Sequence, residues 1–262
     1  MAMQTLPLAS SPATLAEHFH CDGYLVLRGV FQPDEVAALA SEAETLIQRL
    51  ELIDTDNIRC RWQNHVDNGE CLFDCFDPVT DIGPVCKFVA HDRRIVAPLR
   101  AIYGDEAHLF KDKLIFKRPG AQGYALHQDF ISWPEFPESF VTVIVAIDPT
   151  DADNGATEVF PGHHRQGYLS PRDGQYHELS AEAVDESAGV VLDLQPGDLA
   201  LFGGFLPHRS AANNSDRWRR QLYLSYNANR DGGPQREAHY RQFHDWLKQR
   251  YAEYGRMNVY FR

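Results

Sequence analysis

The sequence predicts a mainly β protein with flanking α-helices, built around a double-stranded β-helix (jelly roll) core. The first observation is that, from residue 107 onward, short β-type runs are bounded by Gly, Pro, Asn or Asp. The second is that helical patterns precede and follow this region. No internal repeat or low-complexity segment occurs in the sequence. The predicted core strands are residues 109–117, 123–130, 140–147, 157–160, 190–194, 199–202 and 219–227.

The region before the core contains a short strand and two helical patterns. The strand is predicted over 23–30, and a helix then begins at Pro33, with proline in the first turn and acidic residues at its positive end. Apolar residues recur at three- and four-residue spacing as far as Leu50, which indicates one buried face. A weaker helical pattern covers 95–103. Residues 54–86 have no sustained period and hold several turn formers, so we expect an irregular lid segment there.

The chain closes with an amphipathic helix over 235–254, whose aromatic residues are spaced to pack on a sheet. These patterns predict one domain over 1–262, of which about the first 14 residues, rich in Ser, Pro and Ala, form a loose lead-in. Its expected parts are an N-terminal strand, helices and irregular lid segment (15–106), the jelly-roll core (107–230), and a C-terminal helix and tail (231–262).

Composition excludes several classes of function. Thirty-seven acidic residues against twenty-five Lys and Arg give a net charge of −12, which disfavours nucleic acid and anionic membranes as partners. No run approaches the roughly 20 apolar residues of a membrane span, and the N-terminus lacks the features of a signal peptide. We therefore expect a cytoplasmic protein that acts on a small-molecule substrate; monomer and homo-oligomer both stay open. Five cysteines without a CxxC motif indicate neither a disulfide framework nor a thiolate zinc site.

Three His-x-Asp pairs occur, where chance alone predicts about one from twelve His and twenty-two Asp in 262 residues. Residues i and i+2 of a strand face the same side, so His127 and Asp129 would present an imidazole and a carboxylate to one cavity. His20 precedes the first predicted strand in helix-like sequence, and His65 lies in the irregular segment. We interpret these two as surface histidines that are dispensable for metal binding.

A third metal ligand is predicted at His208, which follows a strand, a Pro-Gly-Asp turn and a second strand. Two histidines and one carboxylate on a small β-barrel form the facial triad that leaves three positions open on iron(II). The same ligands would also suit a hydrolytic zinc ion with one bound water. The triad therefore predicts a metal site and leaves the choice of metal open.

The last predicted strand carries a polar face close to this site. Its side chains alternate, so Arg219, Gln221, Tyr223 and Ser225 share one face. An arginine beside a metal site is a candidate for bidentate capture of a carboxylate, although a solvated strand face would show the same alternation. Because Arg219 follows His208 by only eleven residues, we favour a role in binding.

With these residues in place, the chain resembles the phytanoyl-CoA dioxygenase family of iron(II)/2-oxoglutarate-dependent oxygenases. The resemblance covers nearly the whole chain. Each matching fragment alone is a weak signal, but their order and spacing together are specific. These fragments are Asp22-Gly-Tyr-Leu-Val-Leu-Arg-Gly-Val, Lys117-Arg-Pro-Gly120, His127-Gln-Asp129, Asn154-Gly155, Pro161-Gly-His-His164, Pro196-Gly-Asp198, His208-Arg-Ser210 and Arg219.

The resemblance implies that His127, Asp129 and His208 are the catalytic iron ligands. It also implies that the enzyme uses dioxygen and decarboxylates 2-oxoglutarate to succinate and CO₂ while it hydroxylates a C–H bond. A halogenase of this superfamily would need Gly or Ala in place of Asp129, so hydroxylation is expected rather than chlorination.

The 2-oxoglutarate site follows from the same resemblance. Arg219 would bind the C5 carboxylate, assisted by Ser210, and Lys113 and Thr142 are assigned to the same co-substrate. The sequence departs from the family pattern at Lys113, where Met is often found. It departs again at His163, where Ser is common; we interpret this as a turn substitution, and a contact with substrate as the alternative.

Candidate substrate residues are Arg61, Tyr124, Trp133 and Asn227. Arg61 lies with Arg59 in the 54–86 segment, and two arginines in an acidic chain suggest recognition of an anionic group. The other interpretation is a solvated loop, with the aromatic residues in the core. The chain resembles bacterial small-molecule hydroxylases of the family, including those acting on phosphonates such as 2-aminoethylphosphonate. A hydroxylase of another small metabolite or natural-product intermediate is the alternative.

Two other classes of function compete with this hypothesis. In a catalytically silent jelly-roll binding protein, the His and Asp residues would be satisfied barrel residues and Arg219 would be solvated. In a cupin-like metal hydrolase or isomerase the triad would hold zinc, and Arg219 would have no function in the reaction.

Overall fold

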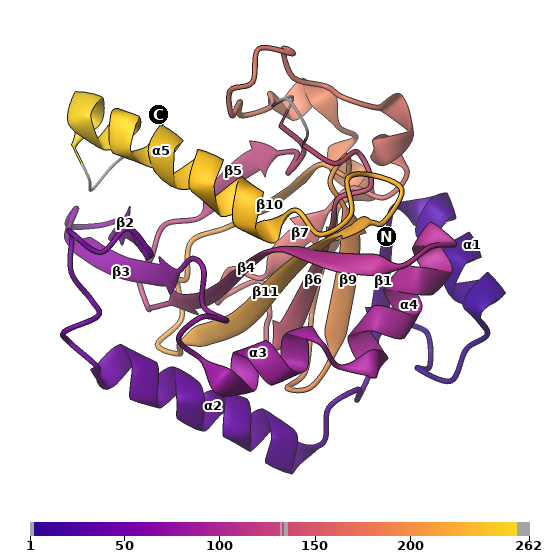
Figure 1. Cartoon of the computed structure of the whole chain (residues 1–262), viewed down its shortest axis with the longest axis horizontal. Coiled ribbons are helices and arrows are strands. Elements are labelled where there is room, and N and C mark those ends of the chain that lie inside the picture. Colours follow the sequence, from indigo (N-terminus) through magenta and orange to yellow (C-terminus); the bar gives the residue numbers. More distant parts are fainter. Residues whose placement is uncertain (1–2, 132, 134–135, 256–262) are drawn as a thin grey trace.

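The computed structural model describes residues 3–131, 133 and 136–255, and it contains two antiparallel sheets and five α-helices in that part of the chain (Figure 1). The larger sheet has the order β1-β9-β6-β11-β4-β3-β2, and the smaller sheet has the order β5-β10-β7-β8. The strands are β1 (Tyr24–Leu27), β2 (Cys60–Asn64), β3 (Cys71–Phe76), β4 (Ala107–Lys117), β5 (Tyr124–His127), β6 (Val141–Ala146), β7 (Thr157–Val159), β8 (Val190–Val191), β9 (Leu199–Gly203), β10 (His208–Ser210) and β11 (Arg219–Ala228). The helices are α1 (Pro12–Asp22), α2 (Pro33–Gln48), α3 (Pro84–Ala90), α4 (Arg93–Tyr103) and α5 (Arg236–Tyr254). The predicted mainly β, jelly-roll architecture with flanking helices is confirmed.

The expectation of an irregular segment over 54–86 is wrong. Residues 60–64 and 71–76 form the β2–β3 hairpin, which pairs with β4 and extends the larger sheet. The strands escaped detection because almost every residue of β3 is buried, Asp74 included, so no polar–apolar alternation marks one solvated face. Helix α1 and strand β10 were also missed: Ser11 caps α1 at the end of the expected lead-in, and β10 is only three residues long.

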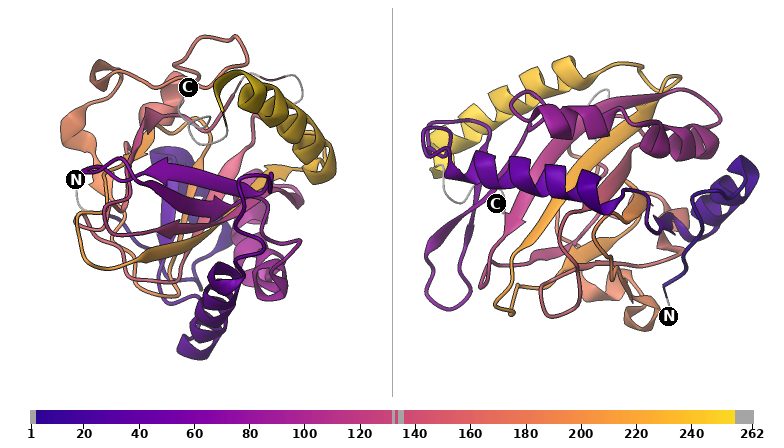
Figure 2. Two further views of the ribbon diagram at one scale, coloured as in Figure 1. Left: turned by 90° about the vertical axis from the view of Figure 1, so that its left-hand side faces the viewer. Right: turned by 90° about the horizontal axis from the view of Figure 1, so that it is seen from below.

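Helices α2, α3 and α4 cover the outer face of the larger sheet (Figure 2). Strand β11 shows how the sheet divides its side chains: Leu222 and Leu224 pack among the helices, while Tyr223 points into the space between the two sheets. Burial of the apolar residues on the outer face stabilises the fold. The predicted alternation along this strand is therefore confirmed, and its polar face is turned inward.

Helix α5 crosses the larger sheet on the side opposite α2 (Figure 1). Its polar contacts with the sheet include the Arg236 Nε, which donates to Asp112 Oδ2 over 2.7 Å, and the Tyr240 hydroxyl, which donates to Asp77 Oδ1 over 3.0 Å. The predicted C-terminal helix is confirmed; residues 256–262 of the predicted tail lie outside the described residues. None of the described helices has the length and apolar character needed to cross a membrane.

Asp77 is the buried centre of a charge cluster that joins β2, β3, β4 and α5. Its side chain is 0% exposed, and its Oδ2 lies 3.2 Å from Lys111 Nζ and 3.9 Å from Arg61 Nη2. Burial alone would raise the pKa of Asp77, but Lys111, Arg61 and Lys113 outweigh burial and lower the pKa to about 2. The carboxylate thus holds Lys111 in place on a strand that also lines the functional cavity.

Asp77→Asn should lower the free energy of unfolding at neutral pH by roughly 2–3 kcal/mol, because it leaves the cations Lys111 and Arg61 without their buried partner. A carboxyl group with a folded pKa of about 2 and an unfolded pKa of about 3.9 stabilises the fold above the unfolded value. That contribution is lost as the pH falls through the pKa of Asp77 in the folded protein. The difference between the variant and the wild type should therefore shrink between about pH 4 and about pH 2. Denaturant unfolding at several pH values measures it.

The matched control is Asp245→Asn, which removes an exposed carboxylate paired with Lys248 over 3.0 Å. This surface pair should contribute less than about 1 kcal/mol. A loss for Asp77→Asn no larger than that of the control, or one of equal size at acid and neutral pH, would contradict the role given to Asp77.

Candidate metal centre and co-substrate pocket

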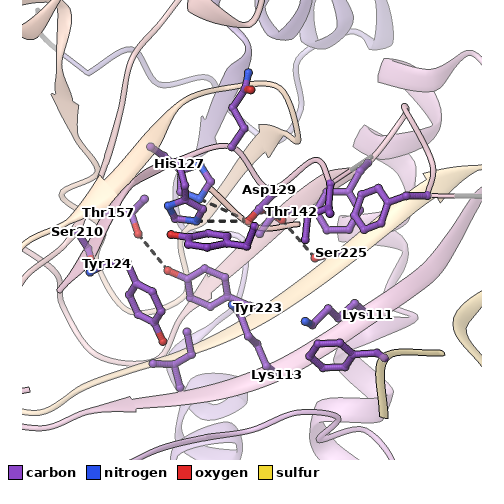
Figure 3. A pocket seen from close by; sticks show the side chains of 18 of the residues that line it. Lys111, Lys113, Tyr124, His127, Asp129, Thr142, Thr157, Ser210, Tyr223 and Ser225 are labelled. Atoms are coloured by element: carbon purple, nitrogen blue, oxygen red, sulfur yellow. Dashed lines mark hydrogen bonds and ion pairs between the residues drawn. The ribbon is translucent and has the colours of Figure 1, made fainter. Parts of the chain in front are cut away.

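Two histidines and one carboxylate meet where β5 and β10 lie side by side. His208 pairs directly with His127 across this antiparallel ladder, and Asp129 follows His127 by two residues. Asp129 Oδ1 lies 3.8 Å from His127 Nε2 and 3.6 Å from His208 Nε2. One candidate ligand atom from each residue lies within 4.8 Å of the others, and Figure 3 shows His127 and Asp129 facing one cavity. The structure thus brings the three predicted ligands together.

The backbone orients both imidazole rings for metal binding. The Nδ1 of His127 lies 2.7 Å from the Ala125 carbonyl oxygen, and the Nδ1 of His208 lies 3.0 Å from that of Leu206. A carbonyl can only accept, so each Nδ1 carries the proton and each Nε2 keeps a lone pair directed toward Asp129. Burial, with the neighbouring His208 second, lowers the pKa of His127 and favours the neutral form that binds metals. The donor set fits an iron(II) ion with open positions.

Thr142 supports the carboxylate of this triad. Its hydroxyl donates to Asp129 Oδ2 over 2.8 Å and lies 3.2 Å from the Ser225 hydroxyl. Asp129 therefore has one oxygen held by the protein and the other turned toward the histidines. The structure places Thr142 on a metal ligand, whereas the sequence assigned it to the co-substrate.

Arg219 lies on the inward face of β11, lines the cavity and is only 1% exposed. Its Nη1 donates to Gln221 Oε1 over 2.8 Å, but its Nε has no hydrogen-bond partner among the described residues. A buried donor without a partner costs about 1–3 kcal/mol, more when it is charged, so this guanidinium is suited to receive a carboxylate. Ser210 lines the same cavity, on β10.

Two lysines of β4 complete the polar wall. Lys113 faces Tyr223 across the β4–β11 ladder, with its Nζ 5.1 Å from the centre of the tyrosine ring. Lys111 is two residues earlier, and its Nζ lies 4.2 Å from the centre of the Phe243 ring as well as close to Asp77. Figure 3 shows both lysines below His127 and Asp129. The sequence analysis identified Lys113 and missed Lys111. Residues i and i+2 of a strand face the same side, so Lys111 could have been inferred from Lys113.

The four predicted substrate residues fall into two groups. Tyr124 and Trp133 line the cavity, which has a volume of about 160 Å³. Arg61 and Asn227 do not line it. Arg61 is buried and donates to the Ile58 and Cys60 carbonyls, and Asn227 holds the turn after β11 through the carbonyls of Ala228, Asp231 and Gly233. The structure supports neither assignment, because both residues lie outside the lining and donate to backbone carbonyls instead.

The remaining residues considered in the sequence lie outside the cavity lining. Arg59 pairs with Asp81 over 3.0 Å, so neither arginine of the 54–86 segment is available to a ligand in the cavity. The His20 ring lies 3.0 Å from the Ile102 carbonyl, and His65 accepts from the backbone N–H of Asp67. His163 accepts from the backbone N–H of Asp185 over 2.9 Å, as expected of a turn residue.

Helix α5 supplies cavity residues that the sequence did not identify. His239, Phe243 and Trp246 line the cavity together with Trp133. Phe243 and Trp246 were expected to pack on a sheet, and their three-residue spacing also presents both rings to a cavity beside that sheet. The cavity therefore has a polar end at Arg219 and an aromatic end under α5.

Thr142→Val should weaken metal binding by about 10- to 100-fold, because Asp129 loses the donor that fixes its orientation while the side-chain volume is kept. Equilibrium binding of iron(II) under anaerobic conditions measures the effect. Thr45→Val serves as control, since the Thr45 hydroxyl is on the exposed face of α2 and bonds only to the Ser41 carbonyl. If both variants bind iron(II) as the wild type does, Thr142 has no part in holding Asp129.

Comparison with known proteins places this geometry in a family. The model of the phytanoyl-CoA dioxygenase family matches residues 19–221. The chain is 30% identical, over 80% of its length and 79% of the relative's, to 2-aminoethylphosphonate dioxygenase from the uncultured bacterium HF130_AEPn_1. It is 36% identical, over half of each chain, to methylphosphonate hydroxylase from Gimesia maris. The crystal structure of EctD from S. alaskensis with 2-oxoglutarate and 5-hydroxyectoine matches with a TM-score of 0.67, at 25% identity, over 88% of this chain and 80% of that one. The chain therefore belongs to the phytanoyl-CoA dioxygenase family and is an iron(II)/2-oxoglutarate-dependent dioxygenase.

Proposed function

We propose that the protein hydroxylates a C–H bond of a small organophosphonate, 2-aminoethylphosphonate or a compound close to it. The observation that carries the proposal is the charge of the cavity wall, which is lined by the cations Lys111, Lys113 and Arg219 and by the single carboxylate of Asp129. Arg209 also borders the cavity, but its charge is paired with Glu158 and Glu186. An anionic substrate and a dianionic co-substrate are both favoured by this excess of positive charge. The similarity to a 2-aminoethylphosphonate dioxygenase and a methylphosphonate hydroxylase supports the same class of substrate.

The residues of the polar end have distinct tasks in this proposal. His127, Asp129 and His208 would hold iron(II), which when bound supplies the activation of dioxygen that C–H oxidation requires. Arg219 would bind the C5 carboxylate of 2-oxoglutarate, because its planar guanidinium matches a carboxylate and its Nε is otherwise without a partner among the described residues. Ser210 would add a second hydrogen bond to that carboxylate.

The substrate would occupy the end of the cavity under α5. Trp133, Phe243 and Trp246 form apolar walls there that exclude water and strengthen electrostatic attraction inside the site. Lys111 is the cation of this end; Asp77 occupies one side of its ammonium, and the group has three donors. A phosphonate oxygen is a suitable acceptor for a remaining donor, and the rest of a small substrate would contact the aromatic rings.

A matched panel of substrates tests the proposal. We expect methylphosphonate or 2-aminoethylphosphonate to raise succinate formation above the uncoupled background, with a hydroxylated product in equal amount. The sulfonate taurine and the carboxylate β-alanine keep the carbon chain of 2-aminoethylphosphonate but carry less negative charge, and they should be poorer substrates. The phosphonate assignment fails if no phosphonate stimulates succinate formation in a protein that binds iron(II) and 2-oxoglutarate.

Arg219→Lys should raise the Kd of 2-oxoglutarate by about 10- to 100-fold, because lysine cannot form the two parallel hydrogen bonds of a guanidinium. The matched control is Arg220→Lys in the neighbouring residue, which points to the other face of β11 and pairs with Asp148 and Glu44. The control should bind the co-substrate as the wild type does. Unchanged co-substrate affinity in Arg219→Lys would contradict the assignment of Arg219 to the C5 carboxylate.

A further inference from the structure

Two buried cations lie side by side at the polar end of the cavity. Lys117 is the last residue of β4 and pairs with Arg219 of β11, so both side chains leave the same face of the sheet. Lys117 is 0% exposed and Arg219 is 1% exposed, yet within the described ranges no carboxylate lies within 4.0 Å of either charged group. Buried charges in proteins are normally paired, so this pair of cations is suited to an anion from outside the chain.

The contacts of Lys117 show how it would act on such an anion. Its Nζ is 3.0 Å from the Ser210 hydroxyl oxygen and 3.4 Å from the Gly155 carbonyl oxygen, and it also donates to the Ala211 carbonyl. These three acceptors match the three protons of an ammonium group. Lys117 is also absent from the lining of the cavity, whereas Ser210 is part of it. Lys117 can therefore reach a ligand through Ser210.

The Ser210 hydroxyl can act toward a ligand only as a hydrogen-bond donor. Its oxygen accepts from Lys117 Nζ and, over 3.3 Å, from the backbone N–H of Tyr124. A hydroxyl has two lone pairs and one proton, so both lone pairs are used and the proton remains. No described residue accepts that proton, which is thus available to an acceptor in the cavity beside Arg219.

We propose that Lys117 is a positioning residue for the co-substrate: its ammonium turns Ser210 into a pure hydrogen-bond donor toward the C5 carboxylate of 2-oxoglutarate. The inference rests on the proposed assignment of Arg219 and Ser210 to that carboxylate. Burial, followed by the charge of Arg219, lowers the pKa of Lys117 well below its usual value. An anion at Arg219 opposes the second of these effects and favours the ammonium form.

This arrangement also explains why glycine occupies position 155. Gly155 has a φ of +69°, and a Cβ atom there would lie 2.7 Å from Lys117 Nζ and 2.4 Å from the Ala211 carbonyl oxygen. The Asn154 side chain holds the same turn by accepting from the backbone N–H of Asp151 over 2.9 Å. The Asn154-Gly155 and Lys117 fragments, which are 37 residues apart in the sequence, therefore belong to one structural device.

Lys117→Met tests the proposal, because it keeps the length of the side chain and removes its donors. The Kd of 2-oxoglutarate should rise by about 10- to 100-fold in the anaerobic iron(II)-loaded protein, measured by calorimetry. The control ligand is 2-oxovalerate, which has the same 2-oxo acid group but a methyl in place of the distal carboxylate. Its Kd should not change, because Lys117 acts on the distal carboxylate alone. Iron(II) affinity and melting temperature show whether the variant is folded.

A double-mutant cycle separates positioning from a general effect of charge. If Lys117 acts through Ser210, the double variant of Lys117→Met and Ser210→Ala should bind 2-oxoglutarate as Ser210→Ala does. If the double variant instead raises the Kd of 2-oxoglutarate by the product of the two single effects, Lys117 does not act through Ser210. Should Lys117→Met not fold, Lys117→Gln keeps a donor for the backbone carbonyls and removes the charge, and it should weaken the binding of 2-oxoglutarate while that of 2-oxovalerate is unchanged.

The outcomes distinguish this inference from the assignment on which it rests. If the wild type does not bind 2-oxoglutarate more tightly than 2-oxovalerate, the assignment of a carboxylate site fails. If it does and Lys117→Met shows the same preference, the role of Lys117 is overturned. An equal loss of affinity for both ligands also overturns it, since that result indicates a structural role for Lys117.

Discussion

The pairing of His127 with His208 across the β5–β10 ladder is the constraint on which the site depends. Strand geometry fixes which residues face each other, and the two-residue period then turns Asp129 to the same side as His127. A shift of one residue in this register would separate the ligands. Because carbonyls of the preceding turn and strand hold each Nδ1, the backbone also sets the tautomer of both rings. The metal site is therefore a product of sheet register.

The same geometry produces a positive cavity inside an acidic protein. The net charge of −12 describes the outer surface, where most of the acidic residues lie. Inward-facing positions of β4 and β11 carry Lys111, Lys113 and Arg219 instead, and Asp77 takes up part of the charge on Lys111. A dianionic co-substrate and an anionic substrate would complete this charge balance, which links the stability of the sheet to the class of ligand it accepts.

Regular strand and helix patterns made much of the molecule predictable. Strand alternation located the triad and the inward position of Arg219, and turn residues marked most strands of the core. The features that the sequence did not predict correctly depend on tertiary contacts. Strand β3 is buried on both sides and shows no alternation, and Arg61 and Asn227 have polar groups already used by the backbone. Helix α5 lines the cavity because Arg236 attaches it to Asp112 of β4. The helix's own sequence pattern gives no sign of this long-range contact.

If the triad and the Arg219 end form one site for iron(II) and 2-oxoglutarate, the co-substrate should change the visible spectrum of the bound metal. Anaerobic titration of the iron(II)-loaded protein with 2-oxoglutarate measures this change. We expect a metal-to-ligand charge-transfer band that grows to saturation at one equivalent in the wild type and is absent in Asp129→Ala. A folded wild-type protein that binds iron(II) and shows no such band at saturating 2-oxoglutarate would mean that the two ends do not form one site.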